Sequence, residues 1–587
     1  MDDGGRMDGT TDARSRTEAG STAVPGAADA EVAERAAAYW DAVLEAHPTS
    51  ATLLGLHEHD DRLEDLSEDA DQRHRDRLAG IAAAVDAIDP DRCSPAGRVT
   101  RSLLRHQLTT SIEAIDLRLV ELASDQMLGP HAELLMVAPQ LTYPEPAHAE
   151  AALTRYAQVP RLLGQAIDRF RAGLAAGRTP AAAVIGRSIN SLTQYLATDP
   201  ATDPFVAAGL PEGWDGADGW REEVAALVRS TIRPAFEVYR DVLRDEIAAD
   251  ARPDDRAGWC WLPDGDELYR ALVRAHTTLD RSAQELHDLG RERTEVVLPA
   301  EYAAIAPEVL GTDVLDEIFG RLRDDPAFKH ADAEEIVRLA EETVARATAA
   351  IPDWFGRLPT SPCRVSPVPD FLAADAPYAY YFPPAVDGSR PGTYFINTAD
   401  PTEASRTEAQ SIAFHEAIPG HHLQIAISQE LDGLPEFQRH DGATSYIEGW
   451  GLYAERLADE MGLYSGPLDR LGMLTADSWR SARLVVDTGL HALGWPREQA
   501  VEYFREHTPV PVDQVLPEVD RYLAMPAQAL SYKVGQLEIQ DLREQARTAL
   551  GSGFDISAFH DVVLGSGAVT LPVLRDLVEA WIQEEGP

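Results

Sequence analysis

Apolar residues recur every three or four positions along most of the chain, as in the segment 101–108, which reads Arg-Ser-Leu-Leu-Arg-His-Gln-Leu. This period places them on one face of a helix. Pro-rich stretches interrupt the pattern at 138–146, 198–213 and 252–264. The pattern predicts a mainly α protein, whose long helices in the first 355 residues span 31–46, 69–88, 98–123, 147–174, 219–249, 265–297 and 333–355.

The pattern changes between residues 351 and 400, where prolines accumulate beside short runs of aromatic and β-branched residues. The runs 378–382 and 393–397 predict short strands. The edge strand of a small sheet can pair with an extended peptide, and its neighbouring pockets can select side chains. A sheet that only packs against helices is the other interpretation of these residues.

The helical period returns after residue 400. Predicted helices span 402–431 (broken at Pro419-Gly420), 442–463, 467–493, 497–507, 512–522, 526–549, 556–564 and 571–583. We therefore expect one large, elongated helical body, with a central cleft between an N-terminal region (30–350) and a C-terminal region (401–587), and a small β-containing insertion (351–400). Residues 1–29 are polar, with no apolar run behind their charges, which predicts a disordered acidic tail rather than a secretory signal.

Charge limits the possible partners. The 98 Asp and Glu residues exceed the 52 Lys and Arg residues, for a net charge of −46. This charge repels nucleic acids and anionic membranes, and no apolar run approaches the ~20 residues of a membrane span. Only Lys329 and Lys533 are lysines, which suits either a high-salt environment or a GC-rich genome. The three cysteines are isolated and lack metal-ligand spacing, so the expected compartment is the cytoplasm.

The segment 414–424 contains the candidate chemistry. In many metal-dependent hydrolases a His-Glu-x-x-His helix holds zinc with two histidines, while the glutamate activates a zinc-bound water. Here Glu416 follows His415, but Pro419 occupies the position of the second histidine. Proline interrupts the helix, and a local bulge that absorbs two residues would bring His421 to the ligand position. His422 is then a substitute ligand or a substrate contact. Surface histidines at a helix break are the alternative.

A second predicted helix, 445–455, offers the third ligand. Glu448 and Glu455 are seven residues apart and lie on one helix face, but about 10 Å apart, so one zinc ion can take only one of them. An exposed acidic face would also explain these residues in so acidic a chain. The flanking Tyr446, Trp450 and Tyr453 favour a buried helix instead.

Three motifs together resemble a known family. They are His-Glu-Ala-x-Pro-Gly-His-His-x-Gln from His415, Glu-Gly-Trp-x-x-Tyr-x-Glu from Glu448, and Tyr-Lys-x-Gly-Gln from Tyr532. The set resembles the domain-of-unknown-function family 885 (DUF885), most densely from about Tyr378 to Glu538. That family is in turn similar to helical zinc metallopeptidases of the thimet-oligopeptidase and Taq-carboxypeptidase types.

The resemblance implies a role for each of these residues. One zinc ion would be held by His415, His421 and Glu448, with Glu455 bracing a histidine. Glu416 would act as the general base. Tyr532 would donate a hydrogen bond to the oxyanion, although a buried core tyrosine would fit the same position.

Further residues are weaker candidates for contacting substrate or holding the ligands in place. Arg483, Asp487 and His491 follow four-residue steps and share a helix face, either as such a network or as a structural ion-pair ladder. Gln528 and Lys533 lie beside Tyr532 in the same segment.

The sequence thus predicts a zinc-dependent hydrolase, and specifically a metallopeptidase that cleaves small peptides. Two alternatives stay open. One is a zinc-dependent amidase or esterase that acts on a non-peptide substrate, which the same chemistry permits. The other is a non-catalytic helical binding or scaffold protein with a vestigial metal site. Phosphate-binding loops, nucleophile elbows and redox cysteine pairs are missing from the sequence.

Overall fold

The computed structural model describes residues 26–368, 377–385 and 390–586. The mainly α prediction is confirmed, since 71% of the chain is helical and 4% is strand. None of the described helices is both long and apolar enough to cross a membrane. The disordered tail predicted for residues 1–29 lies outside the described residues up to residue 25. From Ala27 on that prediction is wrong, because an alanine-rich helix has already begun.

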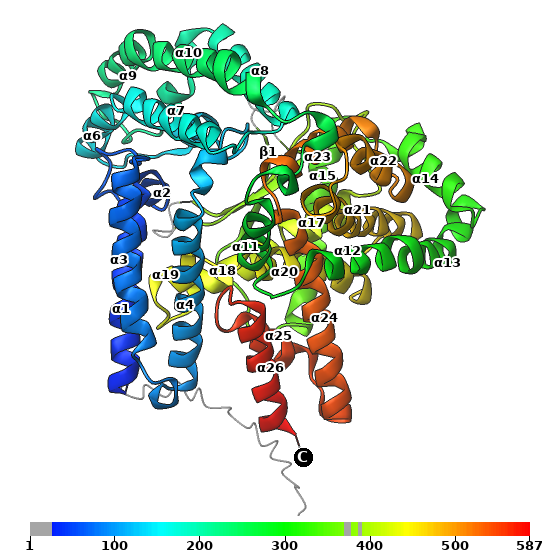
Figure 1. Ribbon diagram of the computed structural model, residues 1–587. Coiled ribbons are helices and arrows are strands. Elements are labelled where there is room, and N and C mark those ends of the chain that lie inside the picture. The colour runs from blue at the N-terminus through cyan, green and yellow to red at the C-terminus, as the bar shows by residue number, and fades with distance from the viewer. Residues whose placement is uncertain (1–25, 369–376, 386–389, 587) are drawn as a thin grey trace, which may run out of the picture.

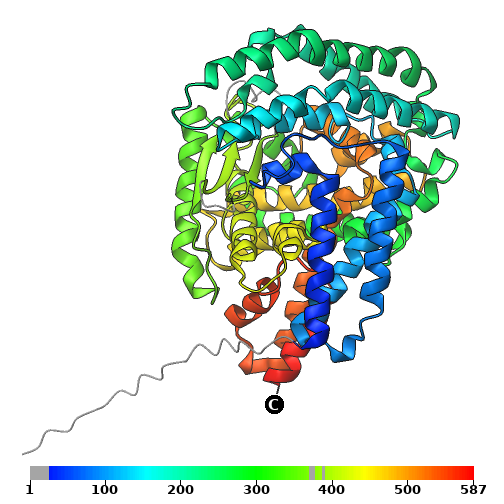
Figure 2. The same ribbon diagram turned by 90° about the vertical axis from the view of Figure 1, so that its left-hand side faces the viewer.

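Three long helices stand side by side at the N-terminal edge (Figure 1, blue), and Figure 2 shows their outer face. They are α1 (Ala27–Ala46), α3 (Glu68–Asp86) and α4 (Pro95–Asp116), with the short α2 (Pro48–Leu53) between the first two. Serine caps start two of them, because Ser67 Oγ accepts from Ala70 N and Ser94 Oγ accepts from Gly97 N. Their apolar stripes share one core, which also includes Phe437 from the C-terminal region.

A second helical layer lies across the top of the molecule in Figure 1. It consists of α5 (Pro130–Val137), α6 (Pro146–Tyr156), α7 (Val159–Ala175), α8 (Ala182–Ala197), α9 (Ala217–Leu227) and α10 (Arg233–Val242). Helix α8 is absent from the long helices predicted above, although Val184, Ile185 and Leu192 form a buried stripe at helical spacing. This layer has its own aromatic core, which includes Tyr156 and Phe236.

The next helices lead to the sheet. They are α11 (Gly265–Thr277), α12 (Ala283–Glu292), α13 (Leu298–Leu310), α14 (Leu315–Asp324) and α15 (Ala333–Ala350). The single helix predicted over 265–297 is wrong. Helix α11 ends at Thr277, and the next residue, Thr278, adopts a left-handed conformation with φ 59°. Helix α12 then begins with a capping box between Ser282 and Glu285.

The sheet has three strands, β1 (Cys363–Pro367), β2 (Ala379–Phe382) and β3 (Gly392–Ile396), in the order β1-β3-β2. β1 pairs parallel to β3, and β2 pairs antiparallel to it. The two predicted strands are present. β1 was not predicted, because its Cys-Arg-Val-Ser-Pro sequence holds a single β-branched residue. Tyr394 and Ile396 of β3 pack with residues of α15 and of the first C-terminal helix.

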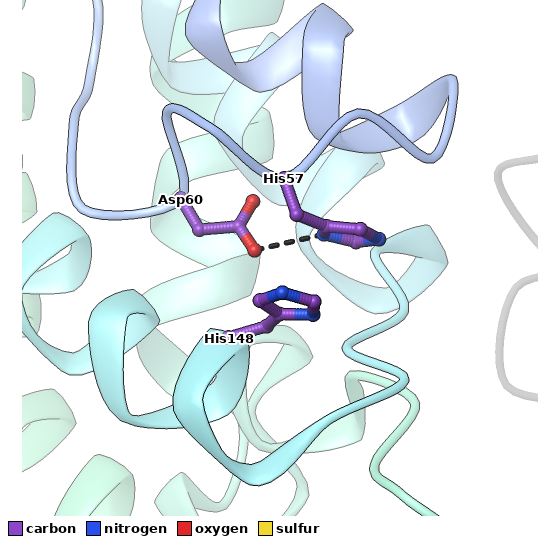
Figure 3. A group of neighbouring side chains, drawn as sticks. All are labelled: His57, Asp60 and His148. Atoms are coloured by element: carbon purple, nitrogen blue, oxygen red, sulfur yellow. Dashed lines mark hydrogen bonds and ion pairs between the residues drawn. The ribbon is translucent and has the colours of Figure 1, made fainter.

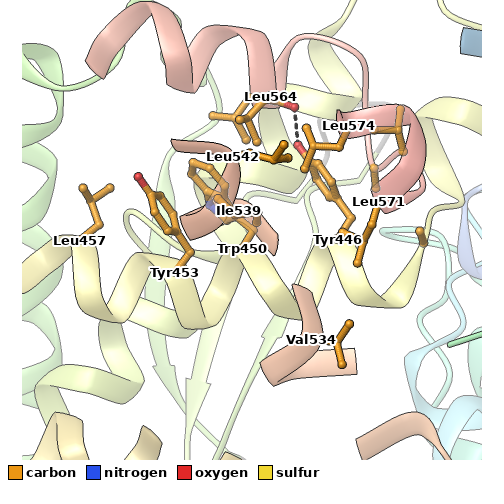
Figure 4. Close-up of a cluster of buried hydrophobic side chains, with 14 of the residues drawn as sticks. Tyr446, Trp450, Tyr453, Leu457, Val534, Ile539, Leu542, Leu564, Leu571 and Leu574 are labelled. Carbon is orange, nitrogen blue, oxygen red and sulfur yellow. Dashed lines mark hydrogen bonds between the residues drawn. The ribbon is translucent and has the colours of Figure 1, made fainter. Parts of the chain in front are cut away.

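Ten helices make up the described part of the C-terminal region. They are α17 (Ala409–Glu416), α18 (His421–Glu430), α19 (Glu436–His440), α20 (Thr444–Glu460), α21 (Pro467–His491), α22 (Arg497–His507), α23 (Val512–Ala524), α24 (Ser531–Leu550), α25 (Ile556–Leu564) and α26 (Leu571–Glu585). Seven of them (α17, α18, α20, α21 and α24–α26) contribute to the largest core. Figure 4 shows Tyr446, Trp450 and Tyr453 of α20 inside this core, so the helix is buried as its aromatic residues indicated.

Helices α20 and α24 cross in direct backbone contact. A Cβ at Gly449 would lie 2.5 Å from the backbone of Gly535, and a Cβ at Gly535 would lie 1.7 Å from the carbonyl oxygen of Ser445. Only glycine permits this approach. The crossing sets the register between the two helices, and therefore the position of Tyr532 opposite Glu448.

Candidate metal centre

Helix α17 stops at Glu416 and α18 begins at His421. The predicted bulge within one helix is therefore wrong, because residues 417–420 form a turn between two helices, with a cis peptide bond at Ile418–Pro419. The His422 amide still donates to the Ala417 carbonyl over 3.0 Å. A Cβ at Gly420 would lie 1.9 Å from the His415 carbonyl oxygen, so the turn requires glycine.

The turn brings three of the predicted residues together. The Nε2 atoms of His415 and His421 each lie 3.5 Å from Oε2 of Glu448. One donor atom from each of the three residues lies within 4.8 Å of the others. The two imidazole rings are nearly perpendicular, at 83°, with centroids 4.6 Å apart. Zinc bonds of about 2.0–2.2 Å in a tetrahedron separate the ligand atoms by about 3.4 Å. The donor set and its spacing therefore fit a zinc ion.

Glu455 lies on the other side of His415. Its Oε1 is 2.8 Å from Nδ1 of His415, and its Oε2 accepts from Ser411 Oγ over 2.7 Å. A carboxylate on the distal ring nitrogen fixes the tautomer that leaves Nε2 free for a metal. Glu455 is 2% exposed, so little water competes for this contact. The seven-residue spacing thus separates a candidate ligand from a bracing carboxylate.

Helix α20 also shapes the space around these groups. A Cβ at Gly451 would lie 2.6 Å from Cε1 of His415, so a glycine makes room for the ring. Trp450 Nε1 donates to the Pro419 carbonyl over 2.9 Å, which ties the turn to the helix that holds Glu448. Helix α20 therefore positions both Glu448 and the turn that brings His415 and His421 together.

Ionisation follows from these contacts. Burial lowers the pKa of His415, but hydrogen bonds to Glu448 and Glu455 outweigh it and raise the value to about 9. Burial raises the pKa of Glu448, but hydrogen bonds to His415 and His421 hold it well below the ordinary range. Burial also raises the pKa of Glu455, but the charge of Arg480 and the contact with His415 outweigh it, so this pKa is lowered. The group holds negative charge that a cation would neutralise.

Tyr532 lies beside the triad. Its ring centroid is 6.3 Å from that of His415, and the two rings are inclined by 20°. Burial raises the pKa of its hydroxyl, as does the charge of Glu448. The guanidinium carbon of Arg483 lies 4.5 Å from the centre of the Tyr532 ring. Gln528, which hydrogen-bonds Tyr532, accepts from Arg521 over 2.9 Å. Tyr532 thus remains a neutral donor, held between the triad and two arginines.

The comparisons with known proteins identify the family of this chain. The model of the family described as "Bacterial protein of unknown function (DUF885)" matches residues 48–578. The chain belongs to the DUF885 family. No curated protein matches this DUF885 chain.

Two solved structures resemble this DUF885 protein over nearly their whole length. The "putative lipoprotein" from Colwellia psychrerythraea has 26% sequence identity and a TM-score of 0.88, with 95% of this chain and 99% of the other covered. A "putative lipoprotein of unknown function" from Shewanella oneidensis has 18% identity and a TM-score of 0.73, with 93% and 99% covered. The second likeness concerns the fold alone.

His422 points away from the triad of the DUF885 chain. Its Nε2 donates to the Ser361 carbonyl, and its Nδ1 accepts from the Tyr381 hydroxyl, both over 2.9 Å. Burial lowers its pKa to about 4, so it stays neutral. The prediction that His422 could replace His421 as a ligand is therefore wrong, because both of its ring nitrogens are engaged on the sheet side.

Glu416 is the last residue of α17 and is half-buried. Its charge adds to burial, the larger cause, in raising the pKa of Tyr394 on β3. It also contributes to the raised pKa of its neighbour His415. The structure therefore places Glu416 beside the triad but outside the three-residue donor group.

Three weaker candidates lie in other networks. Asp487 accepts from the Tyr269 hydroxyl and the Ala527 amide, and burial raises its pKa to about 7. His491 accepts from the Trp259 amide and donates to the Tyr522 carbonyl. Lys533 pairs with Asp477 in a buried contact. Arg483, Asp487 and His491 form no ion-pair ladder in the described chain, but two tyrosines connect them. Arg483 Nε donates to the Tyr522 hydroxyl, and the Tyr522 carbonyl accepts from His491. The Tyr269 ring, whose hydroxyl donates to Asp487, stacks on His491.

Sequence reasoning missed several supporting residues. Ser411 precedes His415 by four positions on α17, and this helical spacing was the available signal. Glu518 and Arg521, three apart on α23, form an ion pair at 3.0 Å behind Tyr522. No local pattern links them to Tyr532, which lies on α24.

Two cavities are lined in part by residues of the C-terminal region. The larger, about 970 Å³, lies among α1, α3, α4, α5 and α7, and Asp441 lines it from the C-terminal side. The smaller, about 260 Å³, is lined by Gln424, Ile447 and again Asp441, among others. Gln424 follows His421 by three residues, and Ile447 precedes Glu448. The residues that line the smaller cavity thus include sequence neighbours of the triad but none of the triad itself, and Asp441 is the one described C-terminal residue that lines the larger cavity.

Proposed function

We propose that this protein is a zinc-dependent hydrolase, and specifically a metallopeptidase. The observation that supports this most is the spacing of 3.5 Å from Glu448 to each of His415 and His421, with nearly perpendicular rings. Glu455 adds support, because a carboxylate behind a ligating histidine is the usual outer partner of a metal site.

When bound, zinc supplies a Lewis acid that polarises a carbonyl oxygen and lowers the pKa of water. The chain's own residues carry the proton and orient the substrate. Glu416 takes a proton from the attacking water and returns it to the leaving amine. Tyr532 donates its hydroxyl hydrogen to the oxygen that becomes negative, and Gln528, Arg521 and Arg483 hold the phenol in place.

A peptide substrate is supported by the sheet next to the site. In the described residues β2 pairs with β3 alone, and an extended peptide that paired with its other edge would add a fourth strand to the sheet. Tyr381 of β2 hydrogen-bonds His422, the residue after His421, so this edge lies close to the triad. The cavity of about 260 Å³, which Phe382 also lines, gives room for side chains of a short peptide.

A digestion of a peptide library with zinc-loaded protein, read by mass spectrometry, tests the proposal. Glu416→Gln should retain zinc and lose roughly 10²–10⁴-fold in rate, because the neutral amide cannot accept the proton. Glu498→Gln is the matched control, since Glu498 is exposed on α22, and it should cleave as the wild type does.

Other outcomes would separate the alternatives. Hydrolysis of small amides or esters without any peptide cleavage would make the protein a zinc-dependent amidase or esterase. The lack of any hydrolysis by a zinc-loaded protein would favour a binding or scaffold role. Loss of zinc in Glu416→Gln would move Glu416 from base to ligand.

A further inference from the structure

A second histidine–carboxylate group lies in the N-terminal half, far from α17 in the chain. His57 and Asp60 belong to the segment between α2 and α3, and His148 lies in the first turn of α6 (Figure 3). One donor atom from each residue lies within 4.8 Å of the other two. The donor set, two imidazoles and one carboxylate, is the same as that of the triad described above.

The carboxylate of this group is fixed in place. Asp60 Oδ2 lies 2.8 Å from His57 Nδ1, and Oδ1 accepts from Thr52 Oγ1 over 2.5 Å. The Asp60 side chain is 1% exposed. One oxygen is therefore held by the protein, while the other faces the two histidines (Figure 3).

His148 has an unused ring nitrogen. Its Nδ1 is buried and finds no hydrogen-bond partner among the described residues. A buried polar atom without a partner is costly, and a metal ion is one group that would satisfy it. The nitrogen belongs to the ring that stacks on His57, so it lies beside the Asp60 carboxylate rather than in an apolar core.

The two rings are stacked, with centroids 4.3 Å apart and planes inclined by 9°. A metal ion lies in the plane of each imidazole that binds it, so two parallel rings cannot both bind one ion until one of them turns. His57 is held by Asp60, whereas turning His148 about its Cβ–Cγ bond breaks no hydrogen bond of Nδ1. Metal binding at this group therefore requires rotation of His148.

We propose that His57, Asp60 and His148 form a second site for a divalent transition metal such as zinc, completed by water. Imidazole and carboxylate ligands suit such ions. Arg155 lies 3.7 Å from Asp60 Oδ1 and reduces the negative charge that attracts a cation. The second site should therefore bind zinc more weakly than the triad.

The site would join two segments that continue into a cavity wall, since residues 57–60 precede the lining residues Leu63 and Glu64, and α6 precedes α7, which carries Arg161. Arg155 of α6 already donates to the carbonyls of Pro48 and His59, and Arg161 of α7 donates to those of Leu63 and Glu64. Leu63, Glu64 and Arg161 line the cavity of about 970 Å³. A metal ion that bridges residues 57–60 to α6 would hold this wall of the cavity in one position.

Zinc binding to the full-length protein tests the proposal. After equilibrium dialysis, elemental analysis should find about two zinc ions per chain in the wild type and about one in either His148→Ala or His57→Gln. His415→Ala should keep about one ion, and His148→Ala combined with His415→Ala none. His59→Ala is the matched control, since His59 lies in the same segment outside the group, and it should bind as the wild type does.

Thermal unfolding gives a second readout. Zinc should raise the Tm of His415→Ala and leave the Tm of the double variant unchanged. Wild-type zinc content in both His148→Ala and His57→Gln would overturn the proposal, and so would a zinc-free His415→Ala protein. These measurements do not depend on the proposed hydrolase activity, because His415→Ala lacks the triad.

Discussion

The two histidine–carboxylate groups hold the same kinds of ligand in different arrangements. In the triad of His415, His421 and Glu448 the rings are inclined by 83°, and both Nε2 atoms lie 3.5 Å from one oxygen. In the group of His57, Asp60 and His148 the rings are inclined by 9°. The first arrangement fits the proposed metal ion with both rings as they stand, whereas the second would require one ring to turn. Ligand identity alone therefore does not determine readiness to bind.

The surroundings differ in charge as well. A second carboxylate, Glu455, stands behind His415, whereas a buried arginine, Arg155, stands behind Asp60. The triad also lies on packed helices, while His57 and Asp60 lie in a connecting segment. A protein prepares a metal site through fixed orientation and net negative charge, and the four expectations below test each contribution.

The largest effect is expected from Glu448→Ala. Loss of the carboxylate that both histidines face should cost far more zinc affinity than the roughly 10–100-fold that follows removal of an outer partner. Chelator competition measures the affinity. Asp60→Ala should leave the tighter of the two zinc-binding events intact. If Glu448→Ala kept its high zinc affinity and Glu455→Ala lost it, Glu455 would be the ligand.

Next in size is Gly420→Ala. The added Cβ would meet the His415 carbonyl at 1.9 Å, so the turn must shift, at a cost of about 3 kcal/mol in the free energy of unfolding. Gly55, which precedes His57, has φ +87° and open space around it, so Gly55→Ala should cost only about 1 kcal/mol. Chemical denaturation compares the two. Equal costs would show that the triad's turn is no more tightly packed than the other segment.

A smaller effect is expected from Glu455→Gln. The amide keeps the shape of the side chain but removes the charge behind His415, so zinc affinity should fall roughly 10–100-fold. Thr52→Val is the corresponding change at the other group, because it removes the hydrogen bond to Asp60. It should lower the zinc affinity of that second site alone. An unchanged affinity in Glu455→Gln would rule out a bracing role for Glu455.

The smallest effect concerns pH in metal-free protein. The pKa of His415 is raised to about 9 from the ordinary histidine value of 6.5, so its protonated form stabilises the fold. This contribution is fully present below about pH 6.5 and is lost as pH rises through about 9, which removes roughly 1–2 kcal/mol between pH 7 and 9. His415→Gln should flatten that slope in urea denaturation. A slope that persists in the variant would assign the titration to another group.

Helical periodicity accounts for most of what could be predicted from the sequence. The seven-residue step from Glu448 to Glu455 places both on one face, and the structure puts one at the triad and the other behind His415. The aromatic residues around them indicated burial, and Trp450 is fully buried. Such inferences succeed because helix geometry is local and regular.

Features that depend on distant segments could not be predicted. Gly420 is required by a carbonyl contact inside the turn, so the Pro-Gly pair indicated a break but not two separate helices. The partners of His422 come from Ser361 and Tyr381, about sixty and forty residues earlier. His57 and His148 meet across ninety-one positions of the chain, and no spacing rule connects them.

Helix α20 carries several of the residues that form and support the triad, and this limits where the chain can accept insertions or deletions. Glu448, Trp450, Gly451 and Glu455 lie within eight residues of one helix. Each added residue turns everything after it by about 100°. A single inserted residue after Gly449 would therefore displace three features together. They are the hydrogen bond from Trp450 to Pro419, the space that Gly451 leaves for the His415 ring, and the contact of Glu455 with that ring. An insertion or deletion here therefore disrupts the whole triad. A change of length in the segment that carries His57 would disrupt only the second group, because that segment connects two helices without being part of either.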